Sequence, residues 1–135
     1  MKTSIAFLFI LAGFGFLASC SSDNGSAAPQ NLVGNWIWMQ SVGGTDGGTE
    51  TPSSTGTVRS LAISTTAVKT YTNGALTGTF PYTIETHTSI FGGQKPMLVF
   101  AEARKQSFEL TSTQLRLNDE CYDCYSSQYE KALEE

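Results

Sequence analysis

The chain is poor in the residue types that build metal and catalytic centres. It has one histidine, His87, and three cysteines among 135 residues. A structural zinc site takes four ligands, and an activated nucleophile needs both a base and a group that orients the base. A single histidine in an expected loop is typical of a solvated side chain. We therefore expect no metal site and no catalytic site, and we assign no cofactor and no enzymatic activity.

Positive charge is scarce as well. The chain has 8 lysines and arginines against 12 aspartates and glutamates, which gives a formal net charge of −4. It contains no long run of like charges and no internal repeat. Because a nucleic-acid partner requires a clustered basic surface, this composition argues against one.

Long apolar runs are missing except at the N-terminus. There, residues 5–17 (IAFLFILAGFGFL) follow the positive charge of Lys2. This run of about 13 residues is too short to cross a bilayer comfortably, since a spanning helix takes about 20 residues. A basic start, a short apolar run and small residues after it are typical of an export signal. We predict a signal peptide over residues 1–19.

The apolar run ends in the four residues Leu17-Ala18-Ser19-Cys20. This pattern resembles the lipobox of bacterial lipoproteins, in which a branched aliphatic residue and two small residues precede a cysteine. The resemblance implies that Cys20 is the first residue of the mature protein and carries acyl chains on its sulfur and its amine. Two acyl chains anchor a protein stably, whereas one chain binds a membrane only marginally. The alternative is an ordinary signal peptide in which the cysteine is incidental.

A polar segment separates this cysteine from the rest of the chain. Residues 20–30 (CSSDNGSAAPQ) contain the Ser, Gly and Pro that are typical of a flexible tether. We therefore expect an exported domain that is attached to a membrane through Cys20 and has no transmembrane element. By analogy with the sorting rules of Gram-negative lipoproteins, Ser21 in place of aspartate favours the outer membrane. Whether the domain faces the periplasm or the medium stays open.

Residues 31–135 have the composition of a single all-β domain. Thr, Ser, Gly and aromatic residues are frequent, and short apolar groups alternate with turn residues instead of recurring every three or four positions. The segment is long enough to bury a core without obligatory disulfides. We predict one antiparallel up-and-down β-barrel of about eight strands, with a two-sheet sandwich as the alternative.

The expected strands are short and follow one another along the chain. A last segment, 128–133, fits either a closing strand or a C-terminal helix, and long loops are expected at 43–56 and 87–96. The other predicted strands cover residues 32–42, 57–65, 67–72, 76–86, 97–103, 107–111 and 114–118.

The first predicted strand is apolar on both faces. Alternation along an extended chain puts Trp36, Trp38 and Gln40 on one face. The other face carries Ile37, Met39 and Ser41. This pattern suggests a strand that is covered on both sides for part of its length.

Two local signals mark turns and edges. Asn73-Gly74 is typical of a two-residue type I′ hairpin turn, in which both residues need a positive φ. Pro81 has no backbone N–H to donate, which indicates an edge strand or a bulge.

The first strand opens with Gly34-Asn35-Trp36, which resembles the Gly-x-Trp signature of lipocalin-like proteins. The order of later features, a long loop, an Asn-Gly hairpin, a late Leu-Arg-Leu strand and a cysteine-rich end, is similar to that of small lipocalin-like bacterial lipoproteins. The resemblance implies that Trp36 packs across the closed end of a barrel. It also implies that a basic residue of a late strand, at the position of Arg116, stacks over Trp36 in a cation–π contact. The alternative is that Trp36 and Trp38 are ordinary core residues, as tryptophans are in any β domain, and have no family-specific role.

The lipocalin-like resemblance implies a membrane-tethered module that binds a small apolar or amphipathic molecule. The barrel is shorter than that of a typical lipocalin, so its cavity is either small or filled by side chains. The alternative function is a structural or accessory lipoprotein that binds a protein partner through an outer strand face or its loops and has no ligand pocket. The residues expected to line the ligand pocket are Trp38, Phe80, Tyr82, Phe100 and Phe108.

Cys121 and Cys124 are the remaining chemically suggestive pair. In an exported protein a local disulfide is favoured over free thiols, a redox centre or a metal site, and no helix is expected beside the pair to activate a thiol. The neighbouring acidic residues Asp119, Glu120 and Asp123 lack the alternating ligands of a calcium loop. We expect them to form a solvated surface.

Overall fold

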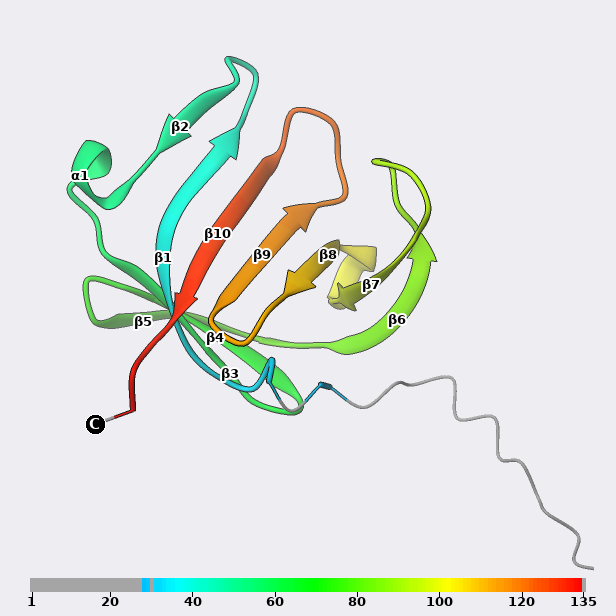
Figure 1. Cartoon of the computed structure of the whole chain (residues 1–135), viewed down its shortest axis with the longest axis horizontal. Coiled ribbons are helices and arrows are strands. Elements are labelled where there is room, and N and C mark those ends of the chain that lie inside the picture. Colours follow the sequence, from blue (N-terminus) through cyan, green and yellow to red (C-terminus); the bar gives the residue numbers. More distant parts are fainter. Residues whose placement is uncertain (1–27, 30, 135) are drawn as a thin grey trace, which may run out of the picture.

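The computed structural model of the chain describes residues 28–29 and 31–134. The predicted signal peptide (1–19), Cys20 and most of the predicted tether lie outside the described residues. Within the part that is described, no helix is long and apolar enough to cross a membrane. The elements, shown in Figure 1, are β1 (Gly34–Gly43), β2 (Gly48–Glu50), α1 (Pro52–Thr55), β3 (Arg59–Ile63), β4 (Ala67–Thr72), β5 (Ala75–Pro81), β6 (Thr83–Thr88), β7 (Gln94–Val99), the 3-10 turn η1 (Ala101–Ala103), β8 (Lys105–Leu110), β9 (Gln114–Asp119) and β10 (Tyr125–Lys131).

The described strands form one antiparallel sheet that curls into a half-barrel (Figure 1). Its order is β5-β4-β3-β1-β10-β9-β8-β7-β6, and β2 pairs with the second half of β1. From β3 to β5 and from β6 to β10 each strand pairs with the next, and β1 joins the two runs. The prediction of a single all-β antiparallel domain is confirmed. The two ends of the sheet, β5 and β6, do not pair with each other, and we call the open boundary between them the seam.

The predicted strand 76–86 is wrong, because the chain makes two strands here instead of one. The break falls at Tyr82, directly after Pro81, which cannot donate to a strand ladder. Tyr82 is held instead by the β3–β4 turn. Its N–H donates to the carbonyl of Thr66 (3.1 Å) and its hydroxyl donates to the carbonyl of Ser64 (2.7 Å). The edge position expected of Pro81 is confirmed, since β5 ends the sheet.

A β-bulge in β1 changes which side chains share a face. Trp38 lies opposite Tyr129 of β10 and Gln40 lies opposite Gln128, so Met39 is the extra residue. Beyond the bulge the alternation is shifted by one position. The second half of the face prediction for this strand is therefore wrong.

The shift brings a serine inward beside the second tryptophan. Ser41 is buried, and its Oγ accepts a hydrogen bond from Trp38 Nε1 (2.9 Å). The outer face of β1 is not covered within the described part of the chain, where Ile37 and Met39 stay exposed. The expectation of a strand covered on both sides is therefore wrong there.

The curled sheet encloses a single apolar core. The cluster of buried side chains consists of Leu32, Trp36, Leu61, Ile63, Val68, Tyr82, Ile84, Leu98, Phe100, Phe108, Leu115 and Leu117. The hairpin between β4 and β5 has positive φ at both Asn73 (51°) and Gly74 (80°), as a type I′ turn requires. The ambiguous C-terminal segment is strand β10, which pairs with both β1 and β9.

Candidate functional site

A hollow of about 330 Å³ opens at the seam, where the end of β5 approaches η1. Its walls are mainly apolar, and one charged side chain of each sign borders it. The lining residues are Phe80, Pro81, Phe100, Ala101, Glu102 and Arg104. Two of the five residues expected to line a ligand pocket, Phe80 and Phe100, are among them.

Arg104 lies between the two phenylalanine rings of the hollow. Its guanidinium carbon is 4.3 Å from the ring centroid of Phe100 and 5.0 Å from that of Phe80. Among the described residues, no carboxylate forms a salt bridge with it. Stacking occupies the faces of a guanidinium but leaves the N–H donors on its edge available. The hollow therefore combines apolar walls with a cationic hydrogen-bond donor.

Phe80 reaches the hollow because the residue two positions before it, Gly78, has no side chain. A Cβ built on Gly78 would lie 2.5 Å from two carbon atoms of the Phe80 ring. The ring therefore occupies the space that any larger residue would fill. Phe80 remains 36% exposed, whereas Phe100 is buried and packs against Tyr82 with 6.4 Å between ring centroids.

The backbone of η1 is in an unusual conformation. Glu102 and Ala103 have φ of 59° and 58°, in the left-handed region that non-glycine residues rarely adopt. The turn is closed by the Phe100 N–H, which donates to the Arg104 carbonyl (2.9 Å). Such positions cost about 1 to 3 kcal/mol each and cluster at functional sites. The strain lies in the segment that carries one wall of the hollow.

The other three predicted pocket residues do not line the hollow. Tyr82 and Phe108 are buried in the core, where Tyr82 supports Phe100 from behind. Burial also raises the pKa of the Tyr82 hydroxyl above its ordinary value. Trp38 is fully buried on β1 and is not part of the core cluster. The structure therefore groups Phe80, Tyr82 and Phe100 but places Trp38 in a different environment.

Trp38 belongs to a polar cluster beside β10. Arg59 stacks over its indole at 4.3 Å and pairs with Glu50 (3.4 Å). The indole N–H donates to Ser41 Oγ, which lies 2.7 Å from Ser127 Oγ. These contacts satisfy the polar atoms around Trp38 from within the chain.

The expected stacking of Arg116 over Trp36 is wrong, because Lys131 lies there instead. Lys131 faces Trp36 directly across the β1–β10 pair, with Nζ 5.6 Å from the ring centroid. Arg116 alternates with the buried Leu115 and Leu117, so it points to the opposite face. There its Nη1 lies 3.8 Å from Glu109 Oε2.

Gly34, the first residue of the Gly-x-Trp motif, sits beside the same lysine. Its φ of 141° lies in a region that favours glycine, and a Cβ there would come within 3.3 Å of the Lys131 side chain. The motif therefore lies at one end of the half-barrel, next to a basic residue of the last strand.

His87 is not the solvated loop residue that the sequence suggested. It lies in β6, and its Nε2 is 2.7 Å from Glu85 Oε2. The hydrogen bond from His87 lowers the pKa of Glu85 below its ordinary value. Cys121 and Cys124 form a disulfide, as predicted for this pair. No group of three or more possible metal ligands occurs among the described residues.

The sequence reasoning missed Arg104, Glu102 and Pro81 as lining residues of a site. No local pattern distinguishes Arg104 from the adjacent Lys105, because one of its stacking partners, Phe80, comes from β5 and the other, Phe100, precedes η1. Pro81 has a signal of its own, the missing backbone N–H, but this signal indicates an edge strand and not a pocket.

No family model, no curated protein and no solved structure matches the chain. The lipocalin-like resemblance therefore rests on the Gly-x-Trp motif and on the order of the elements.

Proposed function

We propose that this protein is a membrane-tethered binding module for a small amphipathic molecule, held in the hollow at the seam. The observation that carries the proposal is the stacking of Arg104 between Phe80 and Phe100 at the border of this hollow. The apolar part of a ligand would lie against the two rings. Its polar end would accept hydrogen bonds from the edge of the Arg104 guanidinium.

The size and lining of the hollow support this function over a lipoprotein without a pocket. Ligand pockets are commonly about 300 to 1,000 Å³, mostly apolar, with a few placed polar groups. The hollow, at about 330 Å³, is at the small end of that range. It fits a short acyl chain or a single ring system with an acidic group. A hydrogen bond to a charged group contributes about 1.5 to 3 kcal/mol, so Arg104 would contribute much of the selectivity.

The proposal includes the lipocalin-like relation and the anchor. The strand order is that of an up-and-down barrel in which β5 and β6 do not pair. The hollow lies beside this unpaired boundary. We infer that the half-barrel is a lipocalin-like barrel opened at the seam. Through acylated Cys20 it would sit at the outer membrane, where amphipathic molecules concentrate.

A small fluorescent acid that brightens in apolar surroundings, dansylglycine, tests the site, because it has a single ring system and one carboxylate. We expect saturable binding by the protein. The Arg104→Gln variant should bind about tenfold more weakly, because the ligand's acidic group loses its charged donor. Arg116→Gln is the matched control, since Arg116 is exposed on the opposite face of the sheet.

Two results would contradict the proposal. One is the absence of saturable fluorescence enhancement. The other is an equal affinity for the wild-type protein and for Arg104→Gln, because the probe would then bind somewhere other than the hollow.

A further inference from the structure

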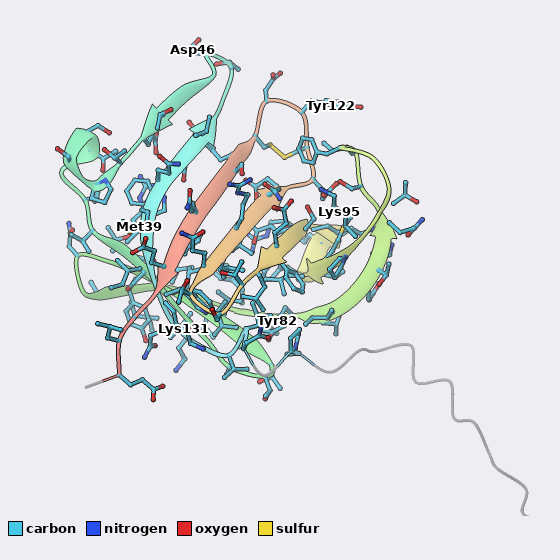
Figure 2. The ribbon with its side chains drawn as sticks, in the orientation of Figure 1. Met39, Asp46, Tyr82, Lys95, Tyr122 and Lys131 are labelled. Carbon is cyan, nitrogen blue, oxygen red and sulfur yellow. A yellow bond between two sulfur atoms is a disulfide. The ribbon has the colours of Figure 1, made fainter. Side chains whose placement is uncertain are left out.

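Three loops gather at the end of the sheet where β1 stops and β10 starts (Figure 1). They are residues 44–47 between β1 and β2, 89–93 between β6 and β7, and 120–124 between β9 and β10. We call them together the loop end. In Figure 2, Asp46 and Tyr122 project from this end, whereas Tyr82 and Lys131 lie toward the other.

The loops are bound to one another. Glu120 accepts hydrogen bonds from the Ser89 hydroxyl (2.9 Å) and from the Ile90 N–H (2.9 Å), which ties the second loop to the third. The Gly44 N–H donates to the Cys124 carbonyl (3.3 Å), which ties the first loop to the third. The disulfide Cys121–Cys124 closes the third loop on itself. The side chains on these loops are therefore presented by a restrained backbone.

Large apolar and aromatic side chains are exposed on this restrained surface. Tyr122, which lies between the two bridged cysteines, is 83% exposed, and Phe91 is 60% exposed. Ile90 and Tyr125 add exposed area beside them. Rigid, exposed aromatic residues are typical anchors of protein interfaces because little conformational entropy is lost when they are buried.

The three loops themselves carry charge of one sign, and Lys95 of β7 lies near enough to Glu120 to favour its ionised form. The segments 44–47, 89–93 and 119–125 contain no lysine, arginine or histidine. Their charged residues are all acidic: Asp46, Asp119, Glu120 and Asp123. Asp46 and Asp123 are exposed; Asp46 lines the same surface depression as Tyr125, and Asp123 follows Tyr122 in the chain.

We propose that the loop end is a docking surface for a second protein whose contact patch carries lysine or arginine. Tyr122 and Phe91 supply the anchors, and the acidic rim supplies charge complementarity that steers a basic patch. A lipid surface fits less well. Membrane-binding tips rely on lysine and arginine, whereas aspartates beside the aromatic residues would be repelled by anionic lipids.

The position of the loop end agrees with this partner. The described chain enters the sheet at the start of β1, and the loop end lies at the opposite end of that strand (Figure 1). With Cys20 anchored as proposed, the docking surface is at the far end of the domain from the attachment point. It shares no residue with the lining of the ligand hollow, so either function can fail without the other.

Site-specific photo-crosslinking in cells that express the full chain tests the proposal. The photoreactive residue p-benzoylphenylalanine replaces Tyr122 in one variant and Phe91 in another. We expect both to crosslink the same protein, through peptides of that protein that contain lysine or arginine. Leu133, which is 93% exposed and lies outside the three loops, is the matched control position and should not give this adduct.

A second substitution, added to a photoreactive variant, distinguishes the contribution of the aromatic anchors from that of the acidic residues. With the photoreactive residue at position 91, Tyr122→Ser should lower the yield about tenfold or more, because an interface anchor is lost. The pair Asp46→Asn and Asp123→Asn should lower the yield and weaken its dependence on salt. Asparagine tolerates the positive φ of Asp123 (60°), so this change preserves the loop.

Three outcomes would overturn the inference. They are adducts with lipid alone, the same protein adduct from position 133, and no protein adduct from either loop position. Unchanged thermal unfolding of each variant establishes that a lost adduct reflects the surface and not the fold.

Discussion

At the scale of single residues, the ligand hollow depends on a glycine that touches no ligand. Gly78 leaves room for the Phe80 ring, and the ring in turn covers one face of Arg104. The Phe80 ring takes this position because Gly78, two positions earlier, has no side chain. This relation is visible only when the inward-facing positions of β5 are known.

Gly78→Ala should therefore damage the hollow more than the fold. The new Cβ would come within 2.5 Å of the Phe80 ring, so the ring has to rotate away and Arg104 loses one stacking surface. We expect weaker binding of dansylglycine and a loss of about 1 kcal/mol or less in the free energy of unfolding, as the ring is a movable side chain.

Gly48→Ala is the control for this change. Gly48 is also a strand glycine, has nothing within 4 Å of a built Cβ and has no positive φ. Urea unfolding measures stability and fluorescence titration measures binding. Equal probe affinities for the two alanine variants would contradict the role assigned to Gly78.

At the scale of elements, the loops of the half-barrel are held by specific polar contacts. Burial by itself would raise the pKa of Glu120, but the hydrogen bonds that its carboxylate accepts, including those from Ile90 and Ser89, lower it overall. A carboxyl group whose pKa is lower in the folded state contributes stability above its ordinary value of 4.5. That contribution is lost as the pH falls through the lowered folded-state pKa.

We therefore expect the 89–93 loop to loosen on acidification. The amide resonance of Ile90 should titrate with a midpoint below 4.5, because its N–H donates to Glu120. Glu120→Gln should remove this titration, whereas Glu130→Gln, on the exposed side of β10, should leave it in place. A midpoint at or above 4.5 in the wild-type protein would contradict the assignment of this contact.

At the scale of the whole molecule, the two end strands of the half-barrel, β5 and β6, each have a free edge, and both edges are protected. A free strand edge is a template for association with other chains. On β5, the bulge at Thr77 and the terminal Pro81 interrupt the edge. On β6, the Glu85 carboxylate, which is hydrogen-bonded to His87, brings charge to the edge. The seam can therefore stay open for a ligand without exposing a regular, uncharged ladder.

The anchoring prediction also belongs to the whole molecule. We expect the wild-type protein to partition into the detergent phase of Triton X-114, since two acyl chains bind a membrane stably. Cys20→Ser should move it to the aqueous phase. Cys121→Ser is the matched control, because it removes a disulfide cysteine and leaves the lipobox intact. Recovery of the wild-type protein in the aqueous phase would contradict lipidation.

The sequence by itself determined the all-β class, the antiparallel meander, the Asn73-Gly74 hairpin and the edge position of Pro81. These features follow from local rules: alternation along a strand, the φ that a tight turn requires and the donor that proline lacks. It also placed two aromatic residues of the hollow, Phe80 and Phe100, among the pocket candidates.

Only the tertiary structure decided the seam, the bulge at Met39, the exchange of Arg116 for Lys131 over Trp36 and the stacking of Arg104. Each of these depends on which strands become neighbours and in what register. One extra residue in β1 moved Ser41 inward, and the pairing of β1 with β10 placed Lys131 opposite Trp36. Contacts between residues far apart in the chain are set by the curl of the sheet, which no short stretch of sequence contains.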